Sequence, residues 1–233
     1  MSGLSNAHHF RKTIAGLCMV LAPLLLLVGV VIHPETGTEA ASTIAAAADD
    51  PDTWYAAHLI VLISLVLAVP AVLGLMHMLR EREVALGHVG GGLGMLGILA
   101  FVGIVAIEGF AGWQAGAGNR TEMVALFERM NDSAGVVIPF YAMSFGFAVG
   151  MLCLALGLYR ARAVQSWTTV VIGLSAVLLA IAFPTASELL SIAGAALLFV
   201  GLGSVGRMVL SESDEDWEHT PEHRGFRPLA GMR

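Results

Sequence analysis

Two histidines and a glutamate stand at the ends of three apolar runs in this sequence. His33 follows the end of the first run, His58 lies near the start of the second, and Glu108 lies near the end of the third. Imidazole nitrogens and carboxylate oxygens bind zinc, copper and iron, and two histidines can also hold a haem from its two faces. We therefore predict a metal site formed by His33, His58 and Glu108, and leave open whether it takes a metal ion or a haem.

A second interpretation of the same residues stays open. Histidine and glutamate near a membrane boundary are often solvated or bonded to loop backbone, and the sequence contains no HExxH or Glu-x-x-His spacing within one helix. Glu188 falls at the same expected depth, near the last turn. Glu108 lies between Ile107 and Phe110, where a lone charge is costly. Proton relay through Glu108 is therefore a further hypothesis for the site.

Composition places these residues in a membrane protein. The 233 residues are 57% hydrophobic and 13% charged, with a mean hydropathy of +0.79. A soluble domain has about 25% charged residues, so most of this chain is not built to face water. We predict an all-α, polytopic membrane protein, a bundle of six transmembrane helices. The expected spans are 14–32, 54–79, 89–112, 134–159, 166–183 and 189–207, within a single domain 1–210, and 211–233 is expected to be a disordered cytoplasmic tail.

The second run has the clearest ends. The residues from Leu59 to Met76 carry no charge, and Pro51 behind Asp50 is typical of a capped first helical turn. A cleaved signal peptide has an apolar region of about 7–15 residues. The first run is longer, so we expect it to stay in the protein as a transmembrane span.

The third run begins with many glycines. In a membrane, small residues allow helix backbones to approach closely, so these positions predict tight packing against a neighbouring helix. A phosphate-binding loop is the rival interpretation, but no Lys, Ser or Thr follows at the required spacing.

A polar interruption at 119–133 predicts a short amphipathic helix on the outer membrane face. Its apolar residues recur at helical spacing, after Thr121 as an expected cap. They are Met123, Leu126, Phe127 and Met130.

Basic residues set the expected orientation. They gather at alternate ends of the runs, and only Arg120 and Arg129 lie on the other side. We therefore expect a multi-pass protein of the cell membrane with both termini cytoplasmic. The basic residues on the expected cytoplasmic side are Arg11, Lys12, Arg80, Arg82, Arg160, Arg162 and Arg207.

Three classes of function remain open: a binding or redox module with an outward-facing His/Glu site, a small transporter, and a structural or assembly partner without catalysis. The formal net charge of −6 and the absence of a basic cluster argue against a nucleic-acid partner. Expected partners are the lipid bilayer and either a second copy or another membrane protein. Cys18 and Cys153 lie inside apolar runs and predict no disulfide framework. No nucleophile or nucleotide motif is present, so the sequence leaves enzymatic activity undecided.

Overall fold

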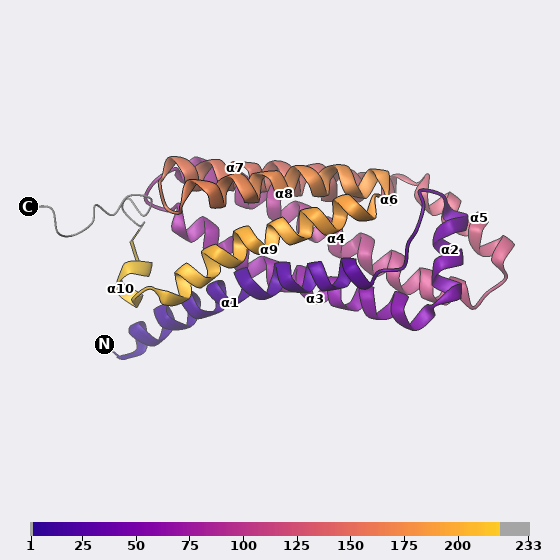
Figure 1. Cartoon of the computed structure of the whole chain (residues 1–233), viewed down its shortest axis with the longest axis horizontal. Helices are drawn as coiled ribbons and strands as arrows, with labels where there is room; N and C mark the ends of the chain where they lie inside the picture. The colour runs from indigo at the N-terminus through magenta and orange to yellow at the C-terminus, as the bar shows by residue number, and fades with distance from the viewer. Residues whose placement is uncertain (1, 220–233) are drawn as a thin grey trace, which may run out of the picture.

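A computed structural model describes residues 2–219, with side chains from residue 7 onward, and every element in this part of the chain is helical (Figure 1). The elements are α1 (Ser2–Ile32), α2 (Ala40–Asp49), α3 (Pro51–Met78), α4 (Val84–Gly116), α5 (Arg120–Asn131), α6 (Ala134–Tyr141), the π-helix η1 (Ala142–Gly146), α7 (Phe147–Arg160), α8 (Ser166–Thr185), α9 (Glu188–Ser211) and α10 (Asp214–Trp217).

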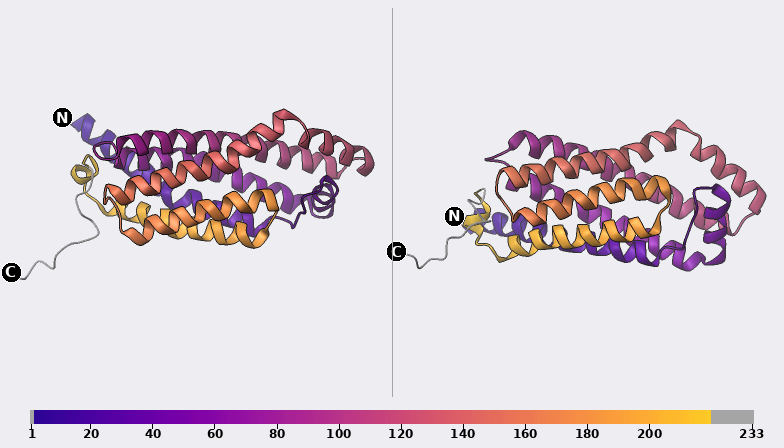
Figure 2. Two further views of the ribbon diagram at one scale, coloured as in Figure 1. Left: turned by 90° about the horizontal axis from the view of Figure 1, so that it is seen from above. Right: turned by 45° about the horizontal axis from the view of Figure 1, so that its top comes forward.

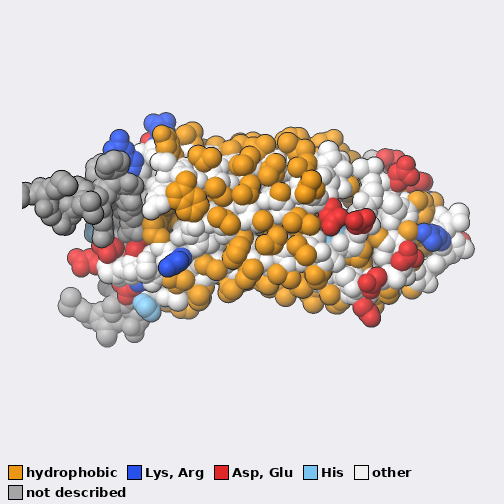
Figure 3. Space-filling view, viewed as in Figure 1, with side chains coloured by type: hydrophobic (Ala, Val, Ile, Leu, Met, Phe, Trp, Pro, Cys, Tyr) orange, Lys and Arg blue, Asp and Glu red, His pale blue; other side chains and the backbone are white. Residues whose placement is uncertain are grey.

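Six of the helical segments are long and apolar enough to cross a membrane, which confirms the six-helix bundle and defines a multi-pass integral membrane protein. The segments are Ala7–Ile32, Pro51–Met78, Val84–Gly116, Ala134–Arg160, Ser166–Thr185 and Glu188–Ser211. Large apolar side chains are exposed along them, including Leu99 at 63% and Val170 at 65%. Figure 3 shows the resulting apolar belt, with most charged side chains at its two ends. Lipid acyl chains are the natural surroundings for such a surface.

The six spans form a closed ring in which each packs against two neighbours. Helix α1 lies between α9 and α3, and the ring continues through α4, α7 and α8 back to α9. Helices α2 and α5 lie at one end, which we call the α2–α5 end, and α10 lies at the other, which we call the α10 end (Figures 1 and 2).

The glycine-rich start of α4 packs closely, as predicted. A Cβ atom on Gly90 would lie 2.9 Å from the carbonyl oxygen of Gly150, and one on Gly97 would overlap the backbone of Phe147. The backbones of α4 and α7 are therefore nearly in contact, which only residues without a side chain permit.

The fourth span separates from α8 at the π-helix. Helix α7 packs on both α4 and α8, whereas α6 packs on α4 and α5. Pro139 lies in α6 shortly before η1, and proline removes a backbone donor and disturbs the regular helix. The divergence leaves space at the α2–α5 end between α6 and the turn that joins α8 to α9.

Helix starts near this space follow from local sequence. The Asp50 side chain accepts a bond from the Thr53 amide at 3.2 Å, and Pro51 follows as the first residue of α3. Ser187 caps α9 in the same way, and Ala186 before it adopts a left-handed φ of 47° to make the tight turn. Helix α5 begins at an Asn119 cap and not at the expected cap Thr121, because Asn119 Oδ1 accepts a hydrogen bond from the Thr121 amide at 3.1 Å. That α5 lies on an outer membrane face stays a prediction.

Residues 212–219, at the start of the expected disordered tail, are folded against the bundle. Trp217 is only 4% exposed and stacks on His77 with 4.6 Å between ring centroids. Lys12 Nζ lies 2.5 Å from an Asp214 carboxylate oxygen and donates to the Glu212 carbonyl at 2.7 Å. The buried Trp217 ring and the contacts of the Lys12 ammonium thus hold this segment against the bundle, although the segment has few apolar residues. The rest of the expected tail, 220–233, lies outside the described residues.

Candidate metal and ligand-binding cavity

A cavity of about 710 Å³ occupies the space at the α2–α5 end. Its walls come from α1, α3, α4, α6, α8 and α9, together with the loop after α1 and residues of α2 and α5. The ionisable side chains that line it are His33, Glu35, His58, Glu108 and Glu188. All three residues of the predicted site therefore line one cavity.

The two imidazoles lie side by side. Their ring centroids are 4.8 Å apart and their planes are tilted by 54°. His33 comes from the residue that follows α1, and His58 comes from the second turn of α3, where it is only 7% exposed. Because Pro34 disfavours helical geometry in the residue before it, α1 ends at this point and His33 can turn toward α3.

Both imidazoles use the same ring nitrogen to bond a backbone carbonyl. His33 Nδ1 lies 2.8 Å from the Pro34 oxygen, and His58 Nδ1 lies 2.8 Å from the Trp54 oxygen. A carbonyl oxygen only accepts, so each Nδ1 carries the hydrogen. In the neutral ring each Nε2 then keeps its lone pair, the form in which histidine binds a metal.

The Trp54 ring packs against both imidazole rings. It is fully buried, with its ring centroid 4.5 Å from that of His58 and 5.2 Å from that of His33. Its Nε1 donates to the Gly109 carbonyl at 3.1 Å, which ties α3 to α4. A Cβ on Gly109 would lie 2.7 Å from His58 Cβ, so the ring cluster needs glycine at this position.

Glu108 belongs to the same cavity but is not joined to the histidines. Within residues 2–219, it makes no hydrogen bond or ion pair with another side chain. Nor is any group of three or more His, Cys, Asp or Glu side chains in this part of the chain arranged to hold a metal ion. The structure therefore brings two of the three predicted ligands together and leaves the carboxylate apart.

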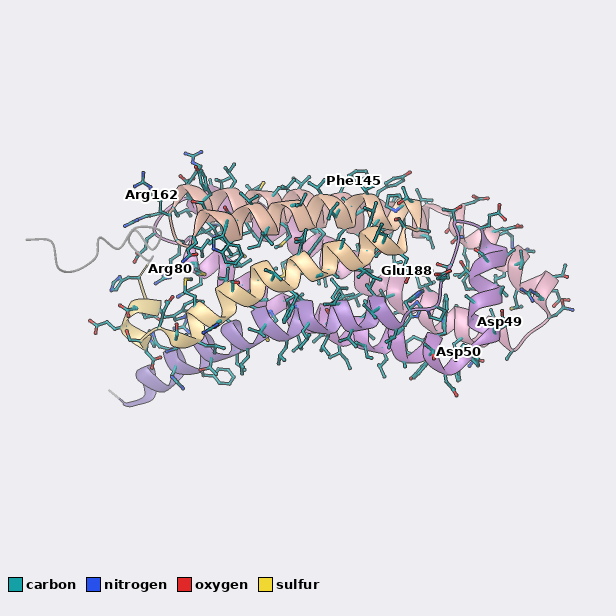
Figure 4. The ribbon with its side chains drawn as sticks, in the orientation of Figure 1. Asp49, Asp50, Arg80, Phe145, Arg162 and Glu188 are labelled. Carbon is teal, nitrogen blue, oxygen red and sulfur yellow. The ribbon has the colours of Figure 1, made fainter. Side chains whose placement is uncertain are left out.

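Two more acidic side chains line the cavity. Glu188, labelled in Figure 4, begins α9, and its carboxyl group is close enough to interact with that of Glu35 from the loop after α1. Sequence reasoning missed Glu35, although its position directly after His33 and Pro34 places it at the same depth.

Burial lowers the pKa of His33 from its ordinary value, against the opposing effect of its bond to the Pro34 carbonyl. Taking an imidazolium out of water disfavours the charged form. His33 therefore keeps a neutral, metal-competent ring to lower pH than a solvated histidine.

Two further histidines, His77 and His88, lie toward the α10 end and are not brought together. His77 stacks on Trp217, whereas His88 is exposed on the first turns of α4 and bonds the Val84 carbonyl at 2.9 Å. His88 thus has the same bond to the fourth preceding carbonyl as His58, without a cavity beside it.

Comparison with protein families, with curated proteins and with solved structures finds no match to this chain. Its class rests on the fold: an integral membrane protein with a large cavity at one end of a six-helix ring.

Proposed function

We propose that this membrane protein is a binding module whose cavity holds a divalent transition-metal ion on His33 and His58. One observation carries the proposal: two neighbouring imidazoles are both fixed through Nδ1, and both leave Nε2 free. Histidines that bind metals in proteins are held in this way by an outer acceptor. The alternative interpretation is that these histidines only bond backbone carbonyls. It accounts for the same two contacts, but it does not explain why the two rings are paired beside a cavity.

The spacing of the rings favours a metal ion over a haem. Metal–nitrogen bonds of about 2.0–2.1 Å place two imidazole centroids about 5 Å apart on one tetrahedral ion, and about 6 Å apart on opposite faces of a haem. The observed 4.8 Å agrees with the first arrangement.

Glu108 is the proposed third ligand, acting through a water molecule. It lines the cavity on α4, one residue from the glycine that contacts His58. A water-mediated carboxylate leaves an open coordination position, which suits a site that exchanges ligands rather than a closed structural one. With copper in the site, the same arrangement supports redox chemistry.

The positions of the basic residues support an outward-facing cavity. Arg80 and Arg162 lie at the α10 end, away from Glu188 (Figure 4). Basic residues near span ends mark the cytoplasmic side, so the α2–α5 end faces outward in the cell membrane.

Metal titration of the purified protein in detergent tests the proposal. We expect stoichiometric binding of Zn²⁺, Cu²⁺ or Ni²⁺, measured by calorimetry and elemental analysis. Loss of the hydrogen-bond partner of a metal-binding histidine weakens metal binding roughly 10–100-fold. His58→Ala and His33→Ala each remove a ligand itself, so each should weaken metal binding by at least that factor. Glu108→Gln should weaken it less, because its contact is indirect.

His88→Ala is the matched control, because His88 makes the same backbone bond on an exposed helix face. Unchanged affinity in this variant, together with loss in His58→Ala, supports the cavity site. Equal losses in both variants, or no stoichiometric metal in the unaltered protein, would contradict the proposal.

Transport is the second candidate, because the void continues toward the middle of the bundle. A small apolar cavity of about 40 Å³ shares Leu26, Phe101, Met143 and Phe183 with the large one. The π-helix passes Met143, and π-helical turns are frequent at functional sites. Uptake of the titrated metal into proteoliposomes would distinguish a transporter from a binding module.

A further inference from the structure

We propose that the cavity also binds an organic ammonium ion with an apolar group, held by the Glu108 carboxylate and surrounded by aromatic rings. This inference rests on the proposed function only in taking the cavity as the binding site, and it names the class of ligand that fills the space beside the histidine pair.

The size of the cavity calls for an organic ligand. Cavities that bind drug-sized molecules measure about 300–1,000 Å³, and the volume of about 710 Å³ falls within that range. A single metal ion with its bound water occupies only a small part of such a space, so the cavity is larger than the metal proposal requires.

The charges along the walls select a cation. Three carboxylates line the cavity, on Glu35, Glu108 and Glu188, and no lysine or arginine is among the described residues that line it. The two imidazoles add no positive charge in their neutral form. The charged side chains of the lining therefore repel an anionic ligand and attract a cation.

Glu108 is the residue that most needs a cationic partner. It lies inside a membrane-spanning helix, within an apolar stretch, and makes no ion pair within residues 2–219. Charges at such depth are normally paired with another group.

Aromatic side chains supply the apolar part of the site. Phe101 and Phe183 meet edge to face, with 4.9 Å between ring centroids, between the large cavity and the small apolar one. Phe127, Phe140 and Tyr141 line the cavity from α5 and α6. Ring faces attract an ammonium group, and the rings accommodate a hydrocarbon tail. This combination excludes a small hydrophilic cation as the best ligand.

Three probes with the same carbon skeleton test the inference on the purified, metal-free protein: 3-phenylpropylammonium, 3-phenylpropanol and 3-phenylpropanoate, with binding measured by calorimetry. We expect the ammonium probe to bind at least roughly tenfold more tightly than the alcohol, because an ion pair with the carboxylate replaces a hydrogen bond from a neutral donor. The carboxylate probe should bind most weakly. Equal affinities for the ammonium and the alcohol would overturn the inference without any variant.

Two substitutions locate the ammonium group. Glu108→Gln should remove the preference for the ammonium probe, because it weakens the binding of the ammonium far more than that of the alcohol. Glu122→Gln, on α5 outside the cavity lining, should change neither. A preference that survives Glu108→Gln would overturn the assignment to Glu108.

The histidine variants separate this inference from the proposed function. His58→Ala should abolish metal binding but keep the ammonium preference. A protein that binds no metal but still prefers the ammonium probe would contradict the metal proposal alone, and the reverse result would contradict the ammonium proposal alone.

Discussion

Two histidines reach the same chemical state through different local structures. His58 bonds the carbonyl of Trp54 inside α3, whereas His33 bonds the carbonyl of Pro34 just beyond the end of α1. Both leave Nε2 as the free nitrogen, so the pair does not depend on a shared motif. A search for ligand spacing within one helix therefore misses it.

Metal affinity should depend on pH in a way that reflects the burial of His33. A solvated histidine has a pKa of about 6.5, and burial lowers the pKa of His33 below that value. Because a metal binds only the neutral ring, affinity should stay constant as pH falls from 8 to about 6.5 and decline only below it. Calorimetric titrations across this range measure the effect. A decline that begins above pH 7 would contradict the lowered pKa.

Gly109 should be essential for the ring cluster. A Cβ at this position would lie 2.7 Å from His58 Cβ, so Gly109→Ala must displace His58 from α4. We expect the variant to lose about 1–3 kcal/mol of stability from overpacking and to bind metal more weakly. Gly103→Ala is the control on the same helix, because nothing lies within 4 Å of a Cβ there. Denaturation in detergent and metal titration give both readouts, and equal behaviour of the two variants would contradict the close contact.

At the scale of helices, α10 joins the start of α1 to the end of α3. Lys12 pairs with Asp214, His8 with Glu218, and Trp217 stacks on His77. Arg80 also donates to the Trp217 carbonyl at 3.2 Å. The hydrogen bond from Lys12 lowers the pKa of Asp214, so this pair stabilises the contact above the ordinary aspartate pKa of about 3.9 and is lost as pH falls below it.

Trp217→Ala should release α10 from the bundle. The substitution removes a buried ring, which in protein cores costs about 3–5 kcal/mol. We expect faster proteolytic cleavage at 212–219 with no change in metal binding at the opposite end. Trp167→Ala is the matched control, because that ring is 45% exposed at the start of α8. Limited proteolysis followed by mass spectrometry measures the rate, and equal cleavage of both variants would contradict the docking of α10.

At the scale of the whole molecule, hydropathy was enough to predict the six spans because each run is long and clearly bounded. The helices extend beyond the apolar runs, as α4 does to Gly116, because helical geometry continues past the lipid boundary while hydropathy does not. For the cavity, the sequence indicated only that its histidines and glutamates lie at a common depth in the membrane. The contact between His33 and His58, the proximity of Glu35 and Glu188, and the folded segment after α9 depend on packing between distant parts of the chain, which no local pattern encodes.

Cysteine labelling tests the proposed orientation. In a variant without Cys18 and Cys153, Thr38→Cys places a thiol in the loop beside the cavity, and Arg162→Cys places one at the α10 end. A membrane-impermeant maleimide should label the first in intact cells and the second only after permeabilisation. The opposite pattern would place the cavity on the cytoplasmic side.

The ion pair between His8 and Glu218 has a consequence for the connectivity of the fold. Because the two ends of the described chain meet, a short linker between them would close the polypeptide into a circle. The circle could then be cut between α7 and α8, at the end far from the cavity. We expect such a circular permutant to keep the contacts of the helix ring, because the linker and the cut both lie at the α10 end.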